Sequence, residues 1–470
     1  MLKHFINILF IYTCSFHLNA DVKPNAFFTS NMVIQRNSQA TIWGTADSGE
    51  KIKVNTSWGE VVSTTANYSG NWFVRITTPS AGGPHKITFK GKNTYVIKNV
   101  LSGDLWLCGG QSNMSWPLEK TTDARIDIPK AEYPHIRQFK VFNLPSSPSP
   151  FPKKSVSGIW MQCAPKIAGE FTAVGFYFAK KIYERTKVPI GILNINWPGS
   201  RIEPWIPNTS NSKTSPNEKG NRRSPGHLYN GLIHPITSAS IKGFLWYQGE
   251  SNGSEGHSYY LKMKNLISGW RKAFRNDFLP FYFVQLANHQ KPNLTNPKGG
   301  DGWAKLRQAQ LDCLGIPHTG MSVTIDIGGQ DIHPSNKKDV GYRLANWALK
   351  NDSHQNIVES GPIFRKMTIE ESKAIIHFHY TGSGLMIGRK TGTQKVIEEK
   401  ASKLKWFSIR DSKGNWFWAD ARIHNNTVIV SSHQVNKPTA VRYAYTWNPQ
   451  GCNLYNKEGL PASPFTTLKE

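Results

Sequence analysis

The stretch LWLCGGQSNMSW, from Leu105 to Trp116, contains the features that decide the fold. It begins as a short apolar run and stops at Gly109 and Gly110, just before Ser112. A short apolar run bounded by turn residues is typical of a fully buried strand. Two glycines let the chain turn sharply and let a substrate approach the backbone, as a displayed serine requires. A purely structural turn has the same pattern, so this stretch alone leaves both interpretations of Ser112 open.

Similar apolar runs alternate with helix-like segments over residues 101–352, among them ILNINW, FLWYQ and VTIDIG. The segment SNKKDVGYRLANWALKN has helical apolar spacing, and its first serine is predicted to cap the helix. Buried strands separated by helices indicate a parallel sheet that is covered on both faces. Ligands bind beyond the carboxyl ends of such strands, so we expect the loops that follow these runs to share one rim.

The sequence on both sides of this region consists of short β-branched and aromatic segments separated by turn residues. This pattern predicts β-sandwich-like domains. We therefore expect a signal peptide, an N-terminal β-sandwich domain, an α/β domain and a C-terminal β-domain. Their predicted bounds are 1–20, 21–100, 101–352 and 353–470.

The first residues have the composition of a secretory signal peptide. Lys3 gives a basic start, FINILFIYTC is an apolar stretch too short to span a membrane, and Ala20 is a small residue suited to cleavage. We therefore expect an exported protein, periplasmic or extracellular, that is cleaved near Ala20 and has no stable membrane insertion.

The net charge of +26 arises from 57 Lys and Arg against 31 Asp and Glu. The basic residues are spread along the chain, with only short clusters such as Lys337–Lys338. This distribution argues against a nucleic-acid partner and favours an acidic glycan or an anionic cell envelope.

Four cysteines follow the predicted signal peptide, and none forms a C-x-x-C pair. Zinc ligation is therefore not expected, while disulfides and buried free thiols both stay open. The four residues are Cys108, Cys163, Cys313 and Cys452.

Each predicted rim loop carries a reactive or hydrogen-bonding group. Beside Ser112, the N–H of Gly199 is a candidate donor to an oxyanion, and so are the side-chain amides of Gln248 and Asn252. The last loop holds His333, a candidate general base that needs a neighbouring group to fix its tautomer.

A second serine competes with Ser112. Gly249, Ser251 and Gly253 form a G-x-S-x-G pattern directly after an apolar run, which is the nucleophile elbow of α/β-hydrolases. This short pattern recurs by chance, and no HGGG-type loop precedes it.

In their order and spacing, the segments GDLWLCGGQSNM, NINWPGSRIEPW, FLWYQGESN and DIHPSNKKDVGYRLA resemble the SGNH hydrolase superfamily and, within it, the sialate O-acetylesterase family. The resemblance covers most of the chain and implies a flavodoxin-like three-layer α/β/α domain flanked by β-domains. It further implies that Ser112 is the nucleophile, that His333 is the general base, and that Ser251 is a bystander. The implied oxyanion donors are the N–H groups of Ser112 and Gly199 and the amide of Gln248, with Asn252 a further candidate.

One position departs from the superfamily pattern, which has an aspartate three residues before the histidine. Here that position is Gln330, and Asp331 lies only two residues before His333. Asp331 is our prediction for the third member of the triad, while Asp326 or a backbone carbonyl remain alternatives.

The resemblance implies a serine esterase that removes O-acetyl groups from sugars, with acetylated sialic acid as the first substrate and with neither metal nor cofactor. Acetylated xylan or another plant or algal polysaccharide is an alternative substrate. A non-catalytic carbohydrate-binding protein on a degenerate hydrolase fold is the alternative of another class. The residues expected to shape the sugar site are Arg201, Glu203, Glu250, Trp116, Trp197 and Trp205. For the three tryptophans, a role in the core is equally open.

Overall fold

The computed structural model describes residues 21–142, 151–207 and 224–468. The predicted signal peptide at 1–20, with its cleavage position, lies outside the described residues. Within the described part of the chain, no helix has the length and apolar character needed to cross a membrane.

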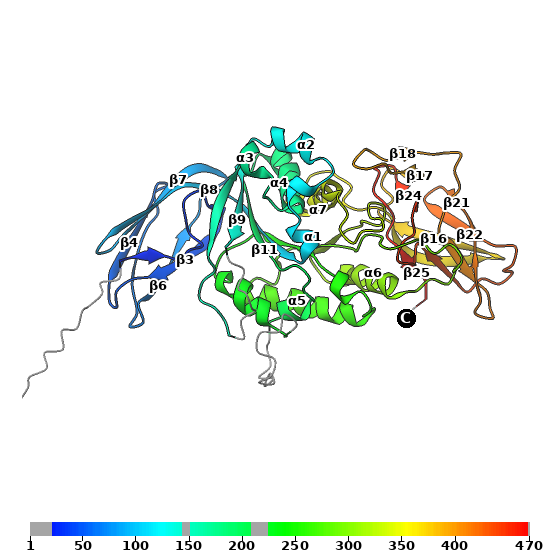
Figure 1. The fold of residues 1–470 in the computed structure, drawn as a ribbon, viewed down its shortest axis with the longest axis horizontal. Helices are drawn as coiled ribbons and strands as arrows, with labels where there is room; N and C mark the ends of the chain where they lie inside the picture. Colours follow the sequence, from blue (N-terminus) through cyan, green and yellow to red (C-terminus); the bar gives the residue numbers. More distant parts are fainter. Residues whose placement is uncertain (1–20, 143–150, 208–223, 469–470) are drawn as a thin grey trace, which may run out of the picture.

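The N-terminal region forms two β-sheets that share an apolar core (Figure 1). One sheet has the strand order β1-β3-β6, and the other joins β5, β4, β7, β8 and β2. Strands β3 and β6 alternate buried and exposed residues, so each presents one face to the core. The strands are β1 (Lys23–Pro24), β2 (Val33–Gln35), β3 (Gln39–Thr45), β4 (Lys51–Thr56), β5 (Val61–Thr65), β6 (Asn71–Thr77), β7 (Gly82–Lys90) and β8 (Thr94–Gly110).

Strand β8 belongs to both the N-terminal region and the central sheet. Its first half pairs antiparallel with β7, and near Leu101 it runs parallel to β2. From Asp104 to Gly110 it pairs instead with β11 on one side, and over Trp106–Gly110 with β12 on the other. The predicted domain boundary after residue 100 therefore falls inside a continuous strand of 17 residues.

The central sheet has the order β10-β9-β11-β8-β12-β13-β14, and all of its strands run parallel except β10. Strands β12 and β13 are buried throughout, as expected for a sheet covered on both faces. The predicted mixed α/β fold is confirmed. The strands are β9 (Tyr133–Val141), β10 (Gly158–Cys163), β11 (Ile190–Asn196), β12 (Gly243–Tyr247), β13 (Phe281–Val284) and β14 (Thr319–Ser322).

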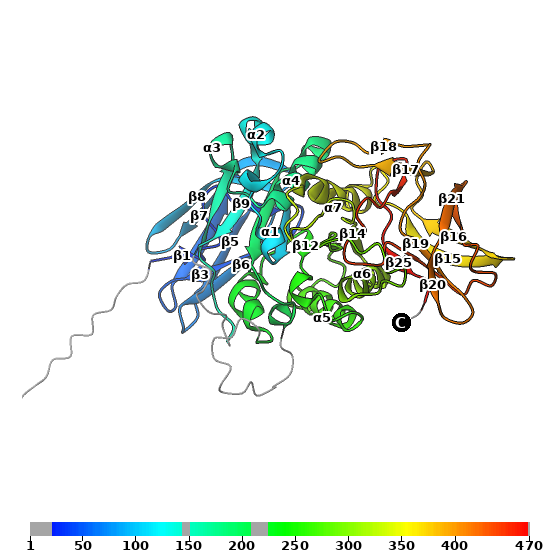
Figure 2. The same ribbon diagram turned by 45° about the vertical axis from the view of Figure 1, so that its right-hand side comes forward.

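Helices lie on opposite sides of these strands, with α4 and α7 packed together on one side and α5 and α6 on the other (Figures 1 and 2). The helices of the described residues are α1 (Ser112–Ser115), α2 (Ala124–Asp127), α3 (Pro165–Ala168), α4 (Ala173–Thr186), α5 (Ser258–Ala273), α6 (Gly302–Asp312) and α7 (Lys337–Asn351). Shorter turns of 3₁₀-helix are η1 (Leu118–Lys120), η2 (Ile128–Lys130), η3 (Glu203–Trp205), η6 (His234–Ile236), η7 (Glu250–Asn252) and η8 (Cys313–Gly315), and η5 (Tyr229–Ile233) is a π-helix.

Two local predictions in the last part of the α/β region need correction. The run VTIDIG is not a strand: β14 ends at Ser322, and the N–H of Gly328 donates to Asn288 Oδ1 at 2.8 Å instead of to a neighbouring strand. The cap of α7 is Asn336, whose Oδ1 accepts the N–H of Asp339 at 3.1 Å.

The C-terminal region contains three small sheets, with the orders β15-β16-β22-β21, β18-β17-β24 and β20-β19-β23-β25. Arg307 of α6 is fully buried and donates to the carbonyls of Thr446 at 2.7 Å and Trp447 at 2.8 Å, which fixes this region to the α/β region. The strands are β15 (Ile363–Glu370), β16 (Lys373–His379), β17 (Leu385–Arg389), β18 (Ile397–Glu398), β19 (Phe407–Arg410), β20 (Trp416–Trp418), β21 (Asp420–His424), β22 (Thr427–Ser431), β23 (Ala440–Tyr443), β24 (Leu454–Asn456) and β25 (Phe465–Thr466).

Cys108, Cys163, Cys313 and Cys452 are buried free thiols, one of the two states that the sequence left open. Burial raises the pKa of the Cys163 and Cys452 thiols to about 12, so neither is ionised near neutral pH.

Candidate active site

The register of the central sheet aligns three of the predicted loops at one edge. Gly110, the last residue of β8, pairs with Asn196 at the end of β11 and with Tyr247 at the end of β12. The loops that carry Ser112, Gly199 and Gln248 therefore begin side by side, as expected for parallel strands.

The turn that carries Ser112 depends on Gly110. Its φ is +136°, and a Cβ there would overlap the carbonyl oxygen of Tyr247 on the adjacent strand. Gly110 therefore permits both the backbone conformation and the close approach of β12. Ser112 follows as the first residue of α1 and is half-buried.

Ser112 and His333 are in hydrogen-bond contact: His333 Nε2 lies 2.8 Å from Ser112 Oγ. The imidazole ring stacks on Trp116, with ring centroids 5.0 Å apart and an interplanar angle of 20°. This is the geometry in which an imidazole accepts the proton of a nucleophilic hydroxyl.

The third predicted triad member is loosely placed. Asp331 Oδ1 lies 3.5 Å from His333 Nδ1 and accepts the backbone N–H of His333 at 2.8 Å. The side chain of Asp331 is 76% exposed. The side chain of the alternative, Asp326, is buried and makes a bidentate pair with Arg343 at 2.7 and 2.8 Å.

The pKa of His333 is lowered from its ordinary value. Burial is the largest cause, and the nearby Lys337 ammonium adds to it, while Asp331 opposes the shift. The imidazole is therefore neutral, and able to accept a proton, at lower pH than an exposed histidine.

Two backbone N–H groups in these loops have no hydrogen-bond partner among the described residues. Within the described parts of the chain, neither Ser112 N–H nor Gly199 N–H donates a hydrogen bond to the protein. Gly199 is exposed, with a φ of +70° and open space where a side chain would stand. Both groups are available to an oxygen atom bound at this edge of the sheet.

The two amides predicted as oxyanion donors are instead buried and used within the protein. Gln248 Nε2 donates to the Ser200 carbonyl at 3.2 Å and to Asn252 Oδ1 at 2.8 Å. Asn252 Nδ2 donates to Glu203 Oε2 at 3.2 Å and to Glu255 Oε1 at 3.0 Å. In contrast to the prediction, neither amide has a hydrogen left for an oxyanion, because the two glutamates orient Asn252 and Asn252 orients Gln248.

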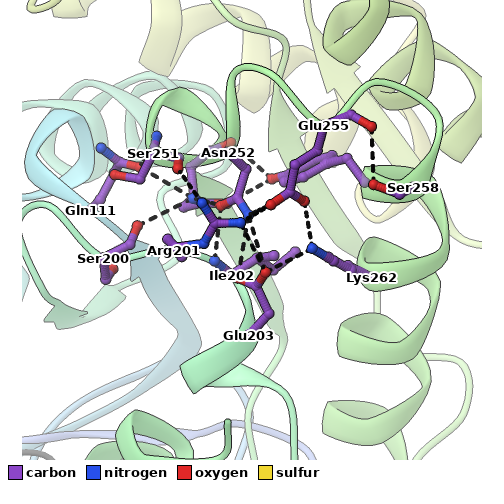
Figure 3. A network of polar contacts seen from close by, with 12 residues as sticks. Gln111, Ser200, Arg201, Ile202, Glu203, Ser251, Asn252, Glu255, Ser258 and Lys262 are labelled. Atoms are coloured by element: carbon purple, nitrogen blue, oxygen red, sulfur yellow. Dashed lines mark hydrogen bonds and ion pairs between the residues drawn. The ribbon is translucent and has the colours of Figure 1, made fainter. Parts of the chain in front are cut away.

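A charged network surrounds Asn252 (Figure 3). Arg201 pairs with Glu203 at 3.2 Å and with Glu255, and it donates to the Ser251 carbonyl at 3.2 Å. Lys262 of α5 pairs with the same two carboxylates at 2.7 and 2.5 Å. The two positive and two negative charges balance, so the predicted sugar-site residues Arg201 and Glu203 already have partners.

Hydrogen bonding keeps Glu203 of this network ionised. Burial alone would raise the pKa of Glu203, but hydrogen bonds from Lys262 and Asn252 outweigh burial and hold the pKa below its ordinary value. Glu203 is therefore ionised over the neutral range and keeps Arg201 and Lys262 in place.

The remaining predicted residues divide between the site and the core. Trp116 lies against His333, whereas Trp197 and Trp205 are buried, and Trp205 packs against the core tryptophan Trp246. Ser251 lies in η7, and among the described residues no histidine is in hydrogen-bond contact with its hydroxyl.

The sequence interpretation missed two residues of the site, Asn113 and Lys337. Asn113 Nδ2 donates to Glu250 Oε1 at 2.5 Å, and Asn113 Oδ1 accepts from Lys337 Nζ. The position of Asn113 directly after Ser112 was the available signal. Lys337 had none, because the pair Lys337–Lys338 has the pattern of a solvent-exposed basic cluster.

Metal-binding side chains do not gather at this edge of the sheet. In the described ranges, no group of three or more His, Cys, Asp or Glu side chains is placed to hold a metal ion.

Comparison with known proteins gives the class of the enzyme. Residues 102–350 match the family described as carbohydrate esterase, sialic acid-specific acetylesterase. The crystal structure of a carbohydrate acetylesterase from Xanthomonas citri is similar over 96% of this chain and 100% of that one, with 35% identity and a TM-score of 0.87. Together with the α/β sheet and the site at its edge, these matches define a carboxylic ester hydrolase that acts on acetylated sugars.

The chain belongs to the family of sialic acid-specific acetylesterases. Among its curated relatives, the sialate O-acetylesterase of Mus musculus is 27% identical and aligns over 94% of this chain and 93% of its own length. The sialate O-acetylesterase of Homo sapiens is also 27% identical, over 94% of this chain and 91% of its own.

Proposed function

We propose that this esterase is an SGNH-type hydrolase that removes O-acetyl groups from sugars through an acetyl-serine intermediate on Ser112. The observation that carries the proposal is the 2.8 Å contact between Ser112 Oγ and His333 Nε2 at the edge of the parallel sheet. The proposed triad is Ser112, His333 and Asp331, with Asp331 as a loosely held orienting group.

In the first step His333 Nε2 takes the proton of Ser112 as Oγ bonds to the acetyl carbonyl carbon. The carbonyl π electrons move to oxygen, and the resulting oxyanion accepts hydrogen bonds from the N–H groups of Ser112 and Gly199. Each such donor contributes about 3 kcal/mol in comparable sites. When the intermediate collapses, the bond to the sugar oxygen breaks and that oxygen takes the proton from His333.

In the second step a water molecule replaces the sugar. His333 accepts a water proton as the water oxygen bonds to the acetyl carbon, and a second oxyanion forms on the same two donors. The bond to Ser112 Oγ then breaks, His333 returns the proton to the serine, and acetic acid leaves and gives its remaining proton to solvent to become acetate.

Acetylated sialic acid is the proposed substrate, and the names of the mammalian relatives support it. The pairing of Arg201 with Glu203 and Glu255 favours a second candidate, a neutral acetylated glycan such as xylan, because this arginine is already neutralised. The carboxylate of a sialic acid substrate would therefore need a cationic side chain other than Arg201 as its partner.

Ser112→Ala and Ser251→Ala, assayed for acetate release, test the nucleophile. Ser112→Ala should lose activity by at least about 10³-fold, and Ser251→Ala should stay near the parent enzyme. Loss of activity only in Ser251→Ala would overturn the proposal, and a parent protein without turnover would indicate a carbohydrate-binding role. A panel of O-acetylated sialic acids and acetylated xylan decides the substrate.

We also propose that the protein is exported, on the basis of the basic start and apolar stretch of residues 1–20. N-terminal sequencing of the secreted protein tests this proposal. A mature chain that begins near Asp21 is the expected result, and retention of Met1 would contradict it.

A further inference from the structure

Lys337 is a fully buried lysine next to the proposed catalytic pair. It is the first residue of α7, and its side chain is inaccessible to solvent. Nζ donates to Asn113 Oδ1 and lies 5.5 Å from the ring centroid of Trp116 and 5.4 Å from that of Tyr247. A buried ammonium is costly unless it is paired or hydrogen-bonded, so these contacts account for its placement.

Asn113 connects Lys337 to two other loops. One amide hydrogen goes to Glu250 Oε1 at 2.5 Å, and the other goes to the carbonyl of Ile332 at 3.0 Å. With Oδ1 bound to Lys337, every hydrogen-bonding group of this side chain is used. Because Asn113 follows Ser112 and Ile332 precedes His333, this single side chain ties the serine turn to the histidine loop.

The charges around the histidine come from three neighbours. Lys337 and His289 oppose protonation of His333, and Asp331 favours it. Trp116 contacts both His333 and Lys337. Its ring stacks on the imidazole of His333, and the Lys337 ammonium lies 5.5 Å from its ring centroid.

The surroundings of Lys337 also change the pKa of its own ammonium group. Burial lowers the pKa of Lys337 to about 7, and the carboxylates of Glu250 and Asp331 oppose the shift. Burial raises the pKa of Glu250, while the hydrogen bond from Asn113 and the charge of Lys337 lower it. At pH values well below 7 Lys337 is therefore mostly in its charged form.

We propose that Lys337 is a positioning residue with two effects: through Asn113 it holds Ser112 and His333 in contact, and its ammonium, which lies against the same Trp116 ring as the imidazole, places a positive charge beside His333. This inference rests on the proposed function, because it concerns the same serine and histidine.

Lys337→Met and Lys337→Gln test the charge effect in the full-length enzyme. Each removes the ammonium, and the glutamine keeps an N–H donor for Asn113. The acid limb of kcat/KM for 4-nitrophenyl acetate should move to higher pH by about half a unit or more, because a positive neighbour of His333 is lost. An unchanged acid limb in folded protein would overturn the charge effect.

Lys338→Met is the matched control, because it removes the same group one residue further along α7. Lys338 Nζ pairs with Asp123 at 2.9 Å and Asp127 at 3.3 Å, and it does not contact Asn113. Its acid limb should coincide with that of the parent enzyme. A shift equal to that of the Lys337 variants would show a general surface-charge effect and contradict the proposal.

Asn113→Ala tests the tie between the two loops. It cuts the tie and keeps the Lys337 side chain, so kcat should fall by about tenfold or more with KM little changed. An unaltered kcat would overturn the positioning effect. Circular dichroism verifies folding of every variant, and if both Lys337 variants fail to fold, Lys337 is structural and the proposal is wrong.

The inactive Ser112→Ala variant separates this inference from the proposed function. If Ser112→Ala keeps its activity, the Ser112–His333 mechanism itself is wrong. If Ser112→Ala is inactive and the Lys337 variants have the parent acid limb, only the role given to Lys337 is wrong.

Discussion

His333 Nε2 lies 2.8 Å from Ser112 Oγ, although the two residues are 221 positions apart in the sequence. The other ring nitrogen has a weaker partner, because Asp331 Oδ1 is 3.5 Å from Nδ1 and the carboxylate is largely in solvent. The serine and histidine are thus fixed more firmly than the group expected to orient them.

Because Asp331 holds His333 only weakly, Asp331→Asn should have a mild effect on kcat. Because the carboxylate is exposed, its loss should lower kcat by about tenfold, far less than the roughly 10⁴-fold loss seen for a buried triad aspartate. Steady-state kinetics with 4-nitrophenyl acetate measures the effect. A loss near 10⁴-fold would show that Asp331 is bound more tightly during catalysis than in this structure.

Asp326→Asn should lower the stability of the protein and leave kcat unchanged. Asp326 is buried and holds Arg343 through two hydrogen bonds, so breaking this pair should cost about 3–5 kcal/mol of unfolding free energy. Chemical denaturation measures that loss. The folded fraction of the variant should keep a normal kcat, and a specific loss of kcat would assign Asp326 to the triad instead.

The pH profile should reach further into the acid range than an ordinary histidine permits. His333 must be neutral to accept a proton, so activity falls as the pH drops through its pKa, and that pKa is lowered by burial and Lys337. We expect the acid limb of kcat/KM to have an apparent pKa below the usual value of about 6.5. A value above about 7 would contradict this prediction.

Gly110→Ala and Gly199→Ala should differ sharply, although both glycines have positive φ angles. At Gly110 the new methyl group would overlap the Tyr247 carbonyl, so the variant should lose about 3 kcal/mol or more and its activity. At Gly199 there is open space, so only the backbone cost of about 1–2 kcal/mol is expected. Thermal unfolding distinguishes the two, and equal losses would contradict the geometry.

Arg201→Ala should affect acidic and neutral substrates equally. The side chain is 34% exposed and paired with Glu203 and Glu255, so its removal disturbs the loop and leaves one carboxylate charge unbalanced, which solvent screens at a partly exposed site. The ratio of kcat/KM for O-acetylated sialic acid to that for a neutral acetylated sugar should stay within about twofold of the parent ratio. A loss confined to sialic acid would identify Arg201 as the residue that binds its carboxylate.

The sequence was most informative where local pattern determines structure. Apolar runs that end in glycine or polar residues predicted the shared edge of Gly110, Asn196 and Tyr247, because parallel strands end on the same side of a sheet. The contact of Ser112 with His333 followed from the family resemblance of two loops placed at that edge.

The sequence was least informative where the direction of a side chain depends on distant partners. Gln248 and Asn252 are amides in a suitable loop, but Glu203 and Glu255 determine which way they point. Lys337 resembles Lys338 in sequence, yet helix packing buries the first and leaves the second near the surface. No local pattern contains this information.

The continuity of β8 determines where the chain can be cut to make a stable fragment. A fragment that starts at residue 101 would cut through a strand whose earlier half is paired with β7 and whose last residue, Gly110, supports the serine turn. We expect such a fragment to expose a frayed, aggregation-prone edge. The N-terminal region and the turn that carries Ser112 are therefore parts of one continuous strand, and we expect insertions to be tolerated in the exposed loops between strands and not at this junction.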